Sequence, residues 1–354
     1  MRPSFAAFAI TVQALFILGH AFFLFTWMQF WSPDHRPAWI IAISILAFSF
    51  IVTSVLAHRY SGLWVRVAYS AASAWLGLAT YFFLAACGCW VVWLARRRLP
   101  DGKVAAALYG VALLVALGGV INAAVLRVRG IEVRLPGLPA DWRGATLGLV
   151  SDLHLGHIRR AGLSRAVVRR LNQAAPRLVL IAGDLFDGTP CNADELVEPW
   201  RDLAMPGYFV AGNHEGYGRE AEFVAAARAV GLEILGSQTV ELAGVQLLGL
   251  PYAERGDLPA FDRHHPSIAL AHAPEHLERI AAAGVSLLVA GHTHGGQFFP
   301  VTLIVRRIYR QFAHGLHRLG TLQVLVSYGV GTWGPPLRVG THPEMMLITL
   351  RGAD

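Results

Sequence analysis

Four short segments of this 354-residue chain combine carboxylate, imidazole and amide side chains, which are the groups that bind divalent metal ions. They are Ser151–His154, Gly183–Asp187, Gly212–Glu215 and Gly291–His294. Each segment follows an apolar run typical of a buried strand, and a lone His272 ends a fifth such run. Ligands of α/β folds bind at the carboxyl ends of strands, so we expect these side chains to converge on one edge. The set predicts a two-metal site suited to phosphoester hydrolysis.

Any one of these side chains alone would be interpreted as an ordinary loop residue, because aspartate and histidine are common in loops. Five strand ends that each deliver a metal-ligand type make that interpretation untenable for the set. His157 lies close to His154 and could line the site, but we expect it in a solvated loop. Cys87, Cys89 and Cys191 permit neither a disulfide framework nor a cysteine zinc site.

The second part of the chain must hold the elements that position these side chains. Short apolar runs predict strands, and amphipathic stretches with outward-facing arginine predict helices between them. The predicted strands are 146–150, 178–182, 208–211, 240–250, 267–271, 287–290, 322–327 and 345–350, and the predicted helices are 163–174 and 221–230. This order predicts an α/β domain at 146–354, a two-sheet β sandwich flanked by helices. Pro136, Gly137 and Pro139 predict a linker at 130–145.

The first part of the chain is predicted to lie in a membrane. Hydrophobic residues make up 55% of the chain and the mean hydropathy is +0.46, which is too apolar for an ordinary soluble enzyme. Uncharged runs cover residues 4–31, 38–57, 67–94 and 104–126, and a membrane-spanning helix needs roughly 20 residues. We therefore expect an α-helical transmembrane bundle, a four-helix anchor at 1–129. A cleaved signal peptide is disfavoured because the first run is long and three more follow.

Positive charge is concentrated around these runs. Residues 1–126 contain eight basic and two acidic residues, a net charge of +6, whereas residues 127–354 contain 22 arginines and 21 acidic residues, a net charge of +1. This distribution argues against a nucleic-acid partner. Arg96, Arg97, Arg98 and Lys103 favour a cytoplasmic loop before the fourth run. We therefore expect a multi-pass protein of the cell inner membrane with an extracytoplasmic second domain, although Arg2, Arg59 and Arg66 favour the opposite orientation.

Polar side chains inside the apolar runs are few. A proton or ion pathway usually contains a set of ionisable groups, and His20 is isolated in the first run. We therefore expect His20 to contact a neighbouring helix, and a four-span transporter with a regulatory domain is disfavoured.

Taken together, the motifs resemble those of the calcineurin-like metallophosphoesterase superfamily. The pattern of that superfamily is D-x-H, G-D-x-x-D, G-N-H-[DE], a lone histidine and G-H-x-H, and all five occur here in order over residues 146–294. Gly295–Gln297 and the stretch 331–340 further resemble the membrane-associated YkuE-like branch. The resemblance implies a phosphoesterase that uses a metal-activated hydroxide.

The resemblance also implies roles for single residues. It assigns the metal ligands as follows: Asp152, His154 and His294 for one divalent ion, Asn213, His272 and His292 for a second, and Asp184 as a bridge between them. His214 would contact the phosphoryl oxygen or protonate the leaving group, and Asp187 would hold the other nitrogen of His214. Glu215 is expected to support the loop and to take no part in the chemistry.

The ligand set and one departure from the pattern limit the metal and the substrate. Mixed carboxylate and imidazole ligands suit Mn, Fe, Zn or Co and do not choose among them. Gly188 stands where protein phosphatases of the superfamily carry arginine, which disfavours a phosphoprotein. We expect a phosphorylated small-molecule or lipid substrate, with a phosphodiester or pyrophosphate of a lipid or cell-envelope precursor as the cleaved group. The alternative, a non-catalytic membrane sensor or scaffold with a phosphoesterase fold, is disfavoured because every ligand is present.

One further segment, 301–310, has an amphipathic pattern. Arg306, Arg307 and Arg310 alternate there with apolar residues. We hypothesise that it lies near the mouth of the site and meets lipid head groups, and a solvated amphipathic element explains the pattern equally well.

Overall fold

The computed structural model describes residues 5–31, 34–96, 102–253 and 258–353, and these form two compact units. A helical unit contains the chain up to Ile121 together with Gly334–Leu337, and an α/β unit contains Asn122–Trp333 and the chain from Arg338 onward. Arg2, Arg97 and Arg98, on which part of the predicted orientation depends, lie outside the described residues.

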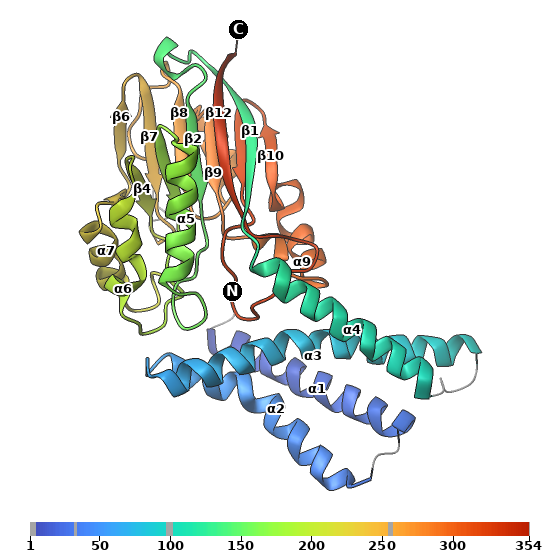
Figure 1. Cartoon of the computed structure of the whole chain (residues 1–354). Helices are drawn as coiled ribbons and strands as arrows, with labels where there is room; N and C mark the ends of the chain where they lie inside the picture. Colours follow the sequence, from blue (N-terminus) through green and yellow to red (C-terminus); the bar gives the residue numbers. More distant parts are fainter. Residues whose placement is uncertain (1–4, 32–33, 97–101, 254–257, 354) are drawn as a thin grey trace. The chain divides into compact units, whose positions relative to one another are not determined.

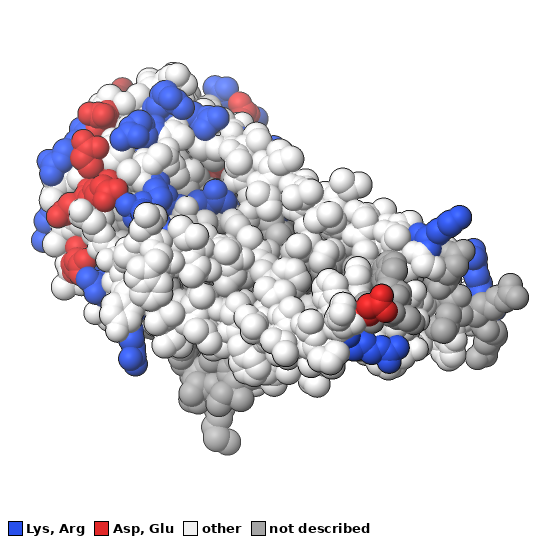
Figure 2. Space-filling model, turned by 60° about the horizontal axis from the view of Figure 1, so that its bottom comes forward, with Lys and Arg blue, Asp and Glu red and all other residues white. Residues whose placement is uncertain are grey.

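The helical unit confirms the four predicted apolar helices. They are α1 (Phe5–Trp31), α2 (Arg36–Ala57), α3 (Leu63–Arg96) and α4 (Gly102–Ala123) (Figure 1). Each contains a segment long and apolar enough to cross a membrane. Charged side chains are sparse along these helices: Figure 2 shows a broad white area across the middle of the view, with a few blue and red atoms at its right end.

His20 contacts neighbouring parts of the helical unit, as predicted. Its Nδ1 lies 2.8 Å from the carbonyl oxygen of Phe16, one turn earlier in α1. Its Nε2 lies 2.9 Å from the indole Nε1 of Trp75 in α3, and only the indole nitrogen can donate in that pair. The two bonds satisfy both ring nitrogens, so His20 holds α1 and α3 together.

The α/β unit is built on two six-stranded sheets. One has the order β1-β12-β2-β3-β4-β5, and the other has the order β10-β11-β9-β8-β7-β6. The first sheet contains β1 (Arg127–Pro136), β2 (Thr146–Val150), β3 (Leu178–Ala182), β4 (Gly207–Val210), β5 (Glu233–Ile234) and β12 (Glu344–Ala353). The second contains β6 (Thr239–Leu242), β7 (Val245–Leu250), β8 (Ser267–Ala271), β9 (Leu287–Ala290), β10 (Gly315–Leu319) and β11 (Leu322–Val326). The helices are α5 (Ala161–Ala174), α6 (Ala193–Val197), α7 (Glu220–Ala229), α8 (Leu277–Ala283) and α9 (Val301–Tyr309).

Three apolar layers hold the sheets and helices together. The central layer lies between the sheets and joins Leu147, Leu180, Leu270 and Val289. The outer face of the first sheet packs on α5, α6 and α7, and the outer face of the second packs on α8. Strand β3 shows how one strand serves two layers, because Leu178 and Leu180 point inward while Val179 and Ile181 point outward. This is the predicted two-sheet sandwich flanked by helices.

Two local predictions were wrong. The segment 130–145 was expected to be a linker, but most of β1 lies there and pairs with β12 in parallel over ten residues. Its inward residues Val133 and Leu135 are fully buried. This burial stabilises a strand here, although Pro136, Gly137 and Pro139 at its end favour a turn. The single strand expected at 240–250 is a hairpin, because Ala243 and Gly244 adopt left-handed conformations between β6 and β7.

The strand directions bring the carboxyl ends of five strands together. Strands β2, β3 and β4 are mutually parallel, and so are β8 and β9. Parallel strands present their carboxyl ends at the same edge of a sheet. The predicted ligands follow these five ends, so they come from both sheets and not from one.

Candidate metal centre

The seven predicted metal ligands lie at the carboxyl ends of β2, β3, β4, β8 and β9. Asp152 and His154 follow β2, Asp184 follows β3, and Asn213 follows β4. His272 follows β8, and His292 and His294 follow β9. Asp152, His154, Asp184 and His272 are at most 2% exposed. Asn213 and His292 are half-buried, so the centre opens on their side.

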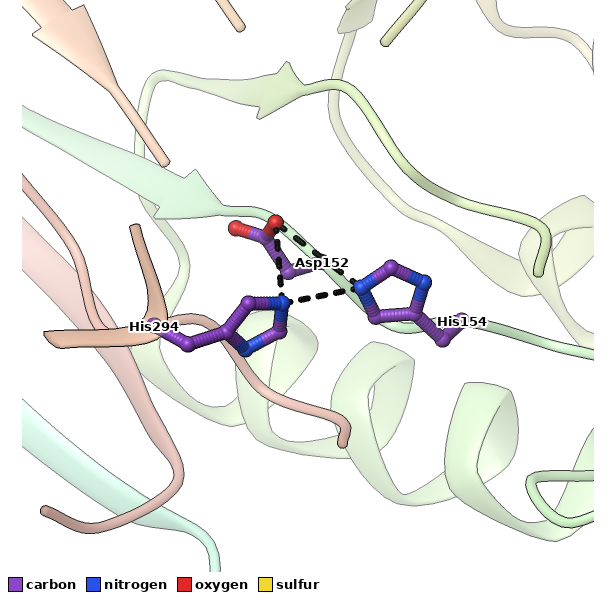
Figure 3. A group of neighbouring side chains, drawn as sticks. All are labelled: Asp152, His154 and His294. Atoms are coloured by element: carbon purple, nitrogen blue, oxygen red, sulfur yellow. Dashed lines mark hydrogen bonds and ion pairs between the residues drawn. The ribbon is translucent and has the colours of Figure 1, made fainter. Parts of the chain in front are cut away.

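One group of ligand atoms converges from β2 and β9. The Oδ1 atom of Asp152 lies 3.5 Å from Nε2 of His294 and 4.0 Å from Nε2 of His154, and the two Nε2 atoms are 2.9 Å apart (Figure 3). Two ligands bound at about 2.1 Å to one ion at right angles lie about 3.0 Å apart. The spacing of these atoms therefore fits a single divalent ion.

A second group converges from β3, β4, β8 and β9. Nε2 of His272 lies 3.3 Å from Oδ2 of Asp184, 3.0 Å from Oδ1 of Asn213 and 3.1 Å from Nδ1 of His292. Nδ1 of His272 donates to the carbonyl oxygen of Ala182 at 2.8 Å. That bond keeps a hydrogen on Nδ1, so Nε2 is the nitrogen that faces the other ligands and that binds a metal once it has lost its proton.

Asp184 lies between the two groups. Its Oδ2 atom is 3.8 Å from Nε2 of His154 in the first group and 3.3 Å from Nε2 of His272 in the second. Its Oδ1 atom accepts the backbone N–H of His214 at 2.9 Å. Asp184 therefore has the position that the sequence analysis assigned to a bridging ligand.

The backbone is strained at these ligands. Asp152, His154, Asp184, His292 and His294 all have positive φ angles, between 48° and 69°. Residues other than glycine adopt this left-handed region infrequently, and such residues concentrate at functional sites. These left-handed conformations turn the chain sharply after the strands. The turn after β2 directs the side chains of Asp152 and His154, two residues apart, toward the same ligand group.

Two glycines allow the ligand loops to approach closely. A Cβ atom at Gly291 would overlap the carboxylate of Asp152, and a Cβ atom at Gly212 would overlap that of Asp184. The loops of neighbouring strands could not come this close with any larger residue. These glycines precede His292 and Asn213, which explains why glycine is needed in the motif immediately before a ligand.

Glu215 supports the loops, as predicted. Its carboxylate is fully buried and accepts the backbone N–H groups of Gly212 at 2.7 Å, Asp184 at 3.0 Å and Phe186 at 2.9 Å. Burial and the nearby Asp184 raise the pKa of Glu215 to about 7, and the N–H groups of Phe186 and Gly212 oppose that rise. Glu215 thus ties the loop after β3 to the loop after β4.

His214 points its Nε2 toward Asp184 Oδ2, at 4.0 Å. The prediction that Asp187 holds its other nitrogen needs a correction, because the contact is made by the backbone carbonyl of Asp187, which accepts from Nδ1 at 2.8 Å. The Asp187 carboxylate instead accepts the backbone N–H groups of His157 and Thr189. Asp187 is therefore a positioning residue. His157 is only 4% exposed, so its predicted solvated loop is also wrong.

The protonation of the centre suits a cation. Burial lowers the pKa values of His154 and His294 well below the usual histidine range, which keeps both imidazoles neutral and able to bind a metal. Burial alone would raise the pKa of Asp184, but His272, His214 and His154 hold it well below its usual range. Burial raises the pKa of Asp152 to about 6, with a contribution from Asp184.

Arg338 is a functional residue that sequence reasoning missed. It is fully buried, and its Nη2 donates to the carbonyl oxygens of Tyr328 and Gly331, each at 2.7 Å. The loop it holds pairs with the first ligand segment, because the N–H of Gly331 donates to the carbonyl of Asp152 at 2.7 Å. The sequence signal was the stretch 331–340, which contains Arg338 and resembles the branch pattern, but that resemblance assigned no role to the arginine.

Two exposed aromatic residues stand beside the centre. Tyr217 and Trp333 are 47% and 52% exposed, and their rings lie 4.7 Å and 5.8 Å from the ring of His214. The hydroxyl of Tyr217 accepts from Nδ2 of Asn213 at 3.0 Å. The exposed surface next to His214 is therefore partly aromatic.

Comparisons with known proteins agree with this centre. The family model described as calcineurin-like phosphoesterase matches residues 145–296, which contain all seven predicted ligands. An uncharacterized metallophosphoesterase of Campylobacter jejuni is 29% identical over 245 residues, which cover 64% of this chain and 63% of that protein. This chain therefore spans less than two thirds of that relative.

Two further relatives connect the centre with membrane proteins and with YkuE. A transmembrane protein with metallophosphoesterase domain from Danio rerio is 30% identical over 295 residues, covering 73% of this chain and 67% of that protein. The uncharacterized metallophosphoesterase YkuE of Bacillus subtilis is 27% identical over 287 residues, covering 74% of this chain and 99% of that protein. These similarities confirm the resemblance drawn from the motifs.

Proposed function

Because this chain belongs to the calcineurin-like phosphoesterase family, we propose that it is a membrane-anchored hydrolase that cleaves phosphoester bonds with two divalent metal ions. The observation that supports this most strongly is the position of Asp184, whose Oδ2 atom faces His154 of one ligand group and His272 of the other. Two separate sets of donors that share one carboxylate suit two neighbouring ions.

In the proposal, Asp152, His154 and His294 would hold one ion, Asn213, His272 and His292 would hold the other, and Asp184 would be shared between them. Bound divalent ions stabilise negative charge on phosphoryl oxygens and make water acidic enough to attack at neutral pH. The ligand types are compatible with Mn, Fe, Zn or Co.

His214 is the proposed proton donor to the leaving group. Its Nδ1 hydrogen is held by the carbonyl of Asp187, so only Nε2 can exchange a proton with a substrate. Nε2 faces Asp184 and the ring is 5% exposed, which leaves the imidazole shielded but at the edge of the centre. The imidazolium form delivers its proton as the phosphorus–oxygen bond breaks, and Asp187 keeps the ring in this orientation.

We propose a phosphodiester or pyrophosphate group of a lipid or cell-envelope precursor as the substrate. Four membrane helices in the same chain would keep the enzyme where such molecules lie. Gly188 has no side chain that could bind a phosphoprotein as the arginine of protein phosphatases does. The ring of Tyr217 packs against Gly188. A small or lipid-linked phosphate remains the better candidate.

The test uses the full chain in detergent or lipid nanodiscs, with bis-p-nitrophenyl phosphate as a soluble diester. Asp184→Ala and Asn213→Ala should each abolish measurable hydrolysis and lower the metal content, because each removes a ligand. His214→Asn should keep the metal and lower kcat by about 10²- to 10⁴-fold, as expected when a general acid is lost. Asp194→Ala, on the exposed first turn of α6, is the matched control and should retain activity. Full activity in either ligand variant would refute the two-metal proposal.

A further inference from the structure

Helix α9 presents an apolar surface to solvent. Five of its nine residues are exposed, and three of these five are large aliphatic residues: Leu303 at 55%, Ile304 at 58% and Ile308 at 64%. Phe299, just before the helix, is 42% exposed. These four residues are here named the α9 patch. A helix that faced only water would carry polar residues at such positions.

Exposed apolar residues of the α/β unit are concentrated in few places. Among its described residues, the large apolar side chains that are exposed are the α9 patch, Tyr217 and Trp333 beside His214, and Val125 and Val128 at the start of β1. Contiguous exposed apolar surface on a soluble domain marks an interaction site, whereas scattered single residues do not. The α9 patch is the largest of these groups.

The charged residues within α9 and directly after it are all arginines. The chain has no acidic residue from Arg279 to Pro343, a stretch that includes α9, and Arg306, Arg307 and Arg310 lie in or directly after the helix. A cavity of about 270 Å³ beside the helix is lined by Arg306, Arg310, His314 and Tyr328 among others, and none of its lining residues is acidic. This surface therefore complements a partner that is both apolar and anionic.

The helix also lies beside the metal centre, and a residue that follows it contacts β1. The ring of Tyr309, in the last turn of α9, lies 6.2 Å from that of His292. At the other end, Gly296, two residues after His294, packs against the backbone of Thr302. His314, five residues after α9, has its Nε2 3.3 Å from Nη1 of Arg129 of β1, and β1 begins four residues after α4 ends.

We propose that α9 is an interfacial helix that binds the surface of an anionic phospholipid bilayer. The α9 patch inserts among the upper acyl chains, while Arg306, Arg307 and Arg310 contact phosphate groups. The cavity beside the helix receives one such head group. Because Tyr309 contacts His292, this arrangement places the bilayer surface at the rim of the metal centre. The inference concerns binding and does not depend on the proposed hydrolysis.

The test is photo-crosslinking of the full chain in nanodiscs of mixed phosphatidylcholine and phosphatidylglycerol. A diazirine amino acid replaces Ile304 or Ile308, and Gln173, an exposed residue of α5, is the control position. Mass spectrometry should find phospholipid adducts at 304 and 308 in at least about tenfold excess over position 173. Adducts to a second copy of the chain, or adducts to water alone, would overturn the proposal.

A second comparison tests the charge. Arg307→Glu should lower the yield of lipid adducts at position 304 in these nanodiscs, whereas Arg169→Glu, an exposed arginine on α5, should leave it unchanged. An unchanged yield in Arg307→Glu would contradict an anionic partner. Hydrolysis of the soluble diester is measured in the same variants and should be unaffected, so failure of the membrane contact and failure of the proposed reaction give different results.

Discussion

His272 and Asp184 show how single residues set the conditions for metal binding. His272 is fully buried, and burial lowers its pKa, but the adjacent carboxylates of Asp184 and Asp152 prevail and raise it to about 10. At neutral pH and without a metal, His272 therefore holds a proton on the nitrogen that faces Asp184. An arriving cation must displace that proton, because only the neutral imidazole binds metal.

Metal affinity should consequently rise with pH. One displaced proton predicts roughly a tenfold gain in apparent Mn²⁺ affinity per pH unit between about pH 7 and 9, where His272 is protonated in the metal-free protein. Below about pH 6 the slope should steepen, because Asp152, whose pKa is about 6, also becomes protonated. Titration calorimetry in buffers of different ionisation enthalpy measures the affinity and the released proton. An affinity that is independent of pH over this range would show that His272 is not a ligand.

At the scale of elements, sequence patterns located most of the strands and helices. The buried runs 146–150, 178–182, 267–271 and 287–290 are strands with those same bounds. A short, continuously apolar run is typical of a strand that is buried on both faces of its sheet. The ligand residues could be predicted because they follow these runs directly. Strand β1 could not, since its burial depends on pairing with β12, more than 200 residues later in the chain. The role of Arg338 escaped notice for a different reason: its carbonyl partners Tyr328 and Gly331 lie within ten residues along the chain, but no local pattern predicts that an arginine in such a loop is buried.

The loops that follow β9 and β2 approach each other closely at Gly291, and this contact can be tested by substitution. Gly291→Ala should push the Asp152 carboxylate out of place, since the new Cβ would overlap it. We expect metal affinity to fall about 10- to 100-fold, as when an outer contact of a metal ligand is lost. Gly130→Ala is the matched control, because no atom lies within 4 Å of its Cβ position. Metal titration of both proteins provides the measurement, and equal affinities would show that the loop after β9 adjusts without cost to the site.

At the scale of the whole molecule, basic residues are concentrated around the apolar helices and not around the metal centre. The basic excess belongs to residues 1–126, around the apolar helices, while the rest of the chain is nearly neutral. Such an excess directs how a chain inserts into a membrane, and it does not bear on the chemistry of the metal centre. The family relationship accounts for the centre, and the four apolar helices are long enough to cross a membrane.

The proposed extracytoplasmic position of the α/β unit can be tested by labelling. In a variant without the three native cysteines, Gln173→Cys should react with a membrane-impermeant maleimide in intact spheroplasts. Lys103→Cys, at the first turn of α4 and so on the opposite side of one span from the α/β unit, should react only after lysis. The reverse pattern would place the α/β unit in the cytoplasm, as Arg59 and Arg66 alone would favour.

The position of β12 also has a consequence for biosynthesis. β12 lies between β1 and β2, yet it is synthesised 194 residues after β2 ends, which takes roughly 10 to 40 s on a ribosome. Throughout that interval one edge of β2 has no partner, and β1 has none at all in its sheet. Asp152 therefore follows a strand with an open edge while the rest of the chain is being made. The nascent domain is prone to aggregation for this period, and a ribosome that stalls before residue 344 releases a chain whose first sheet is incomplete.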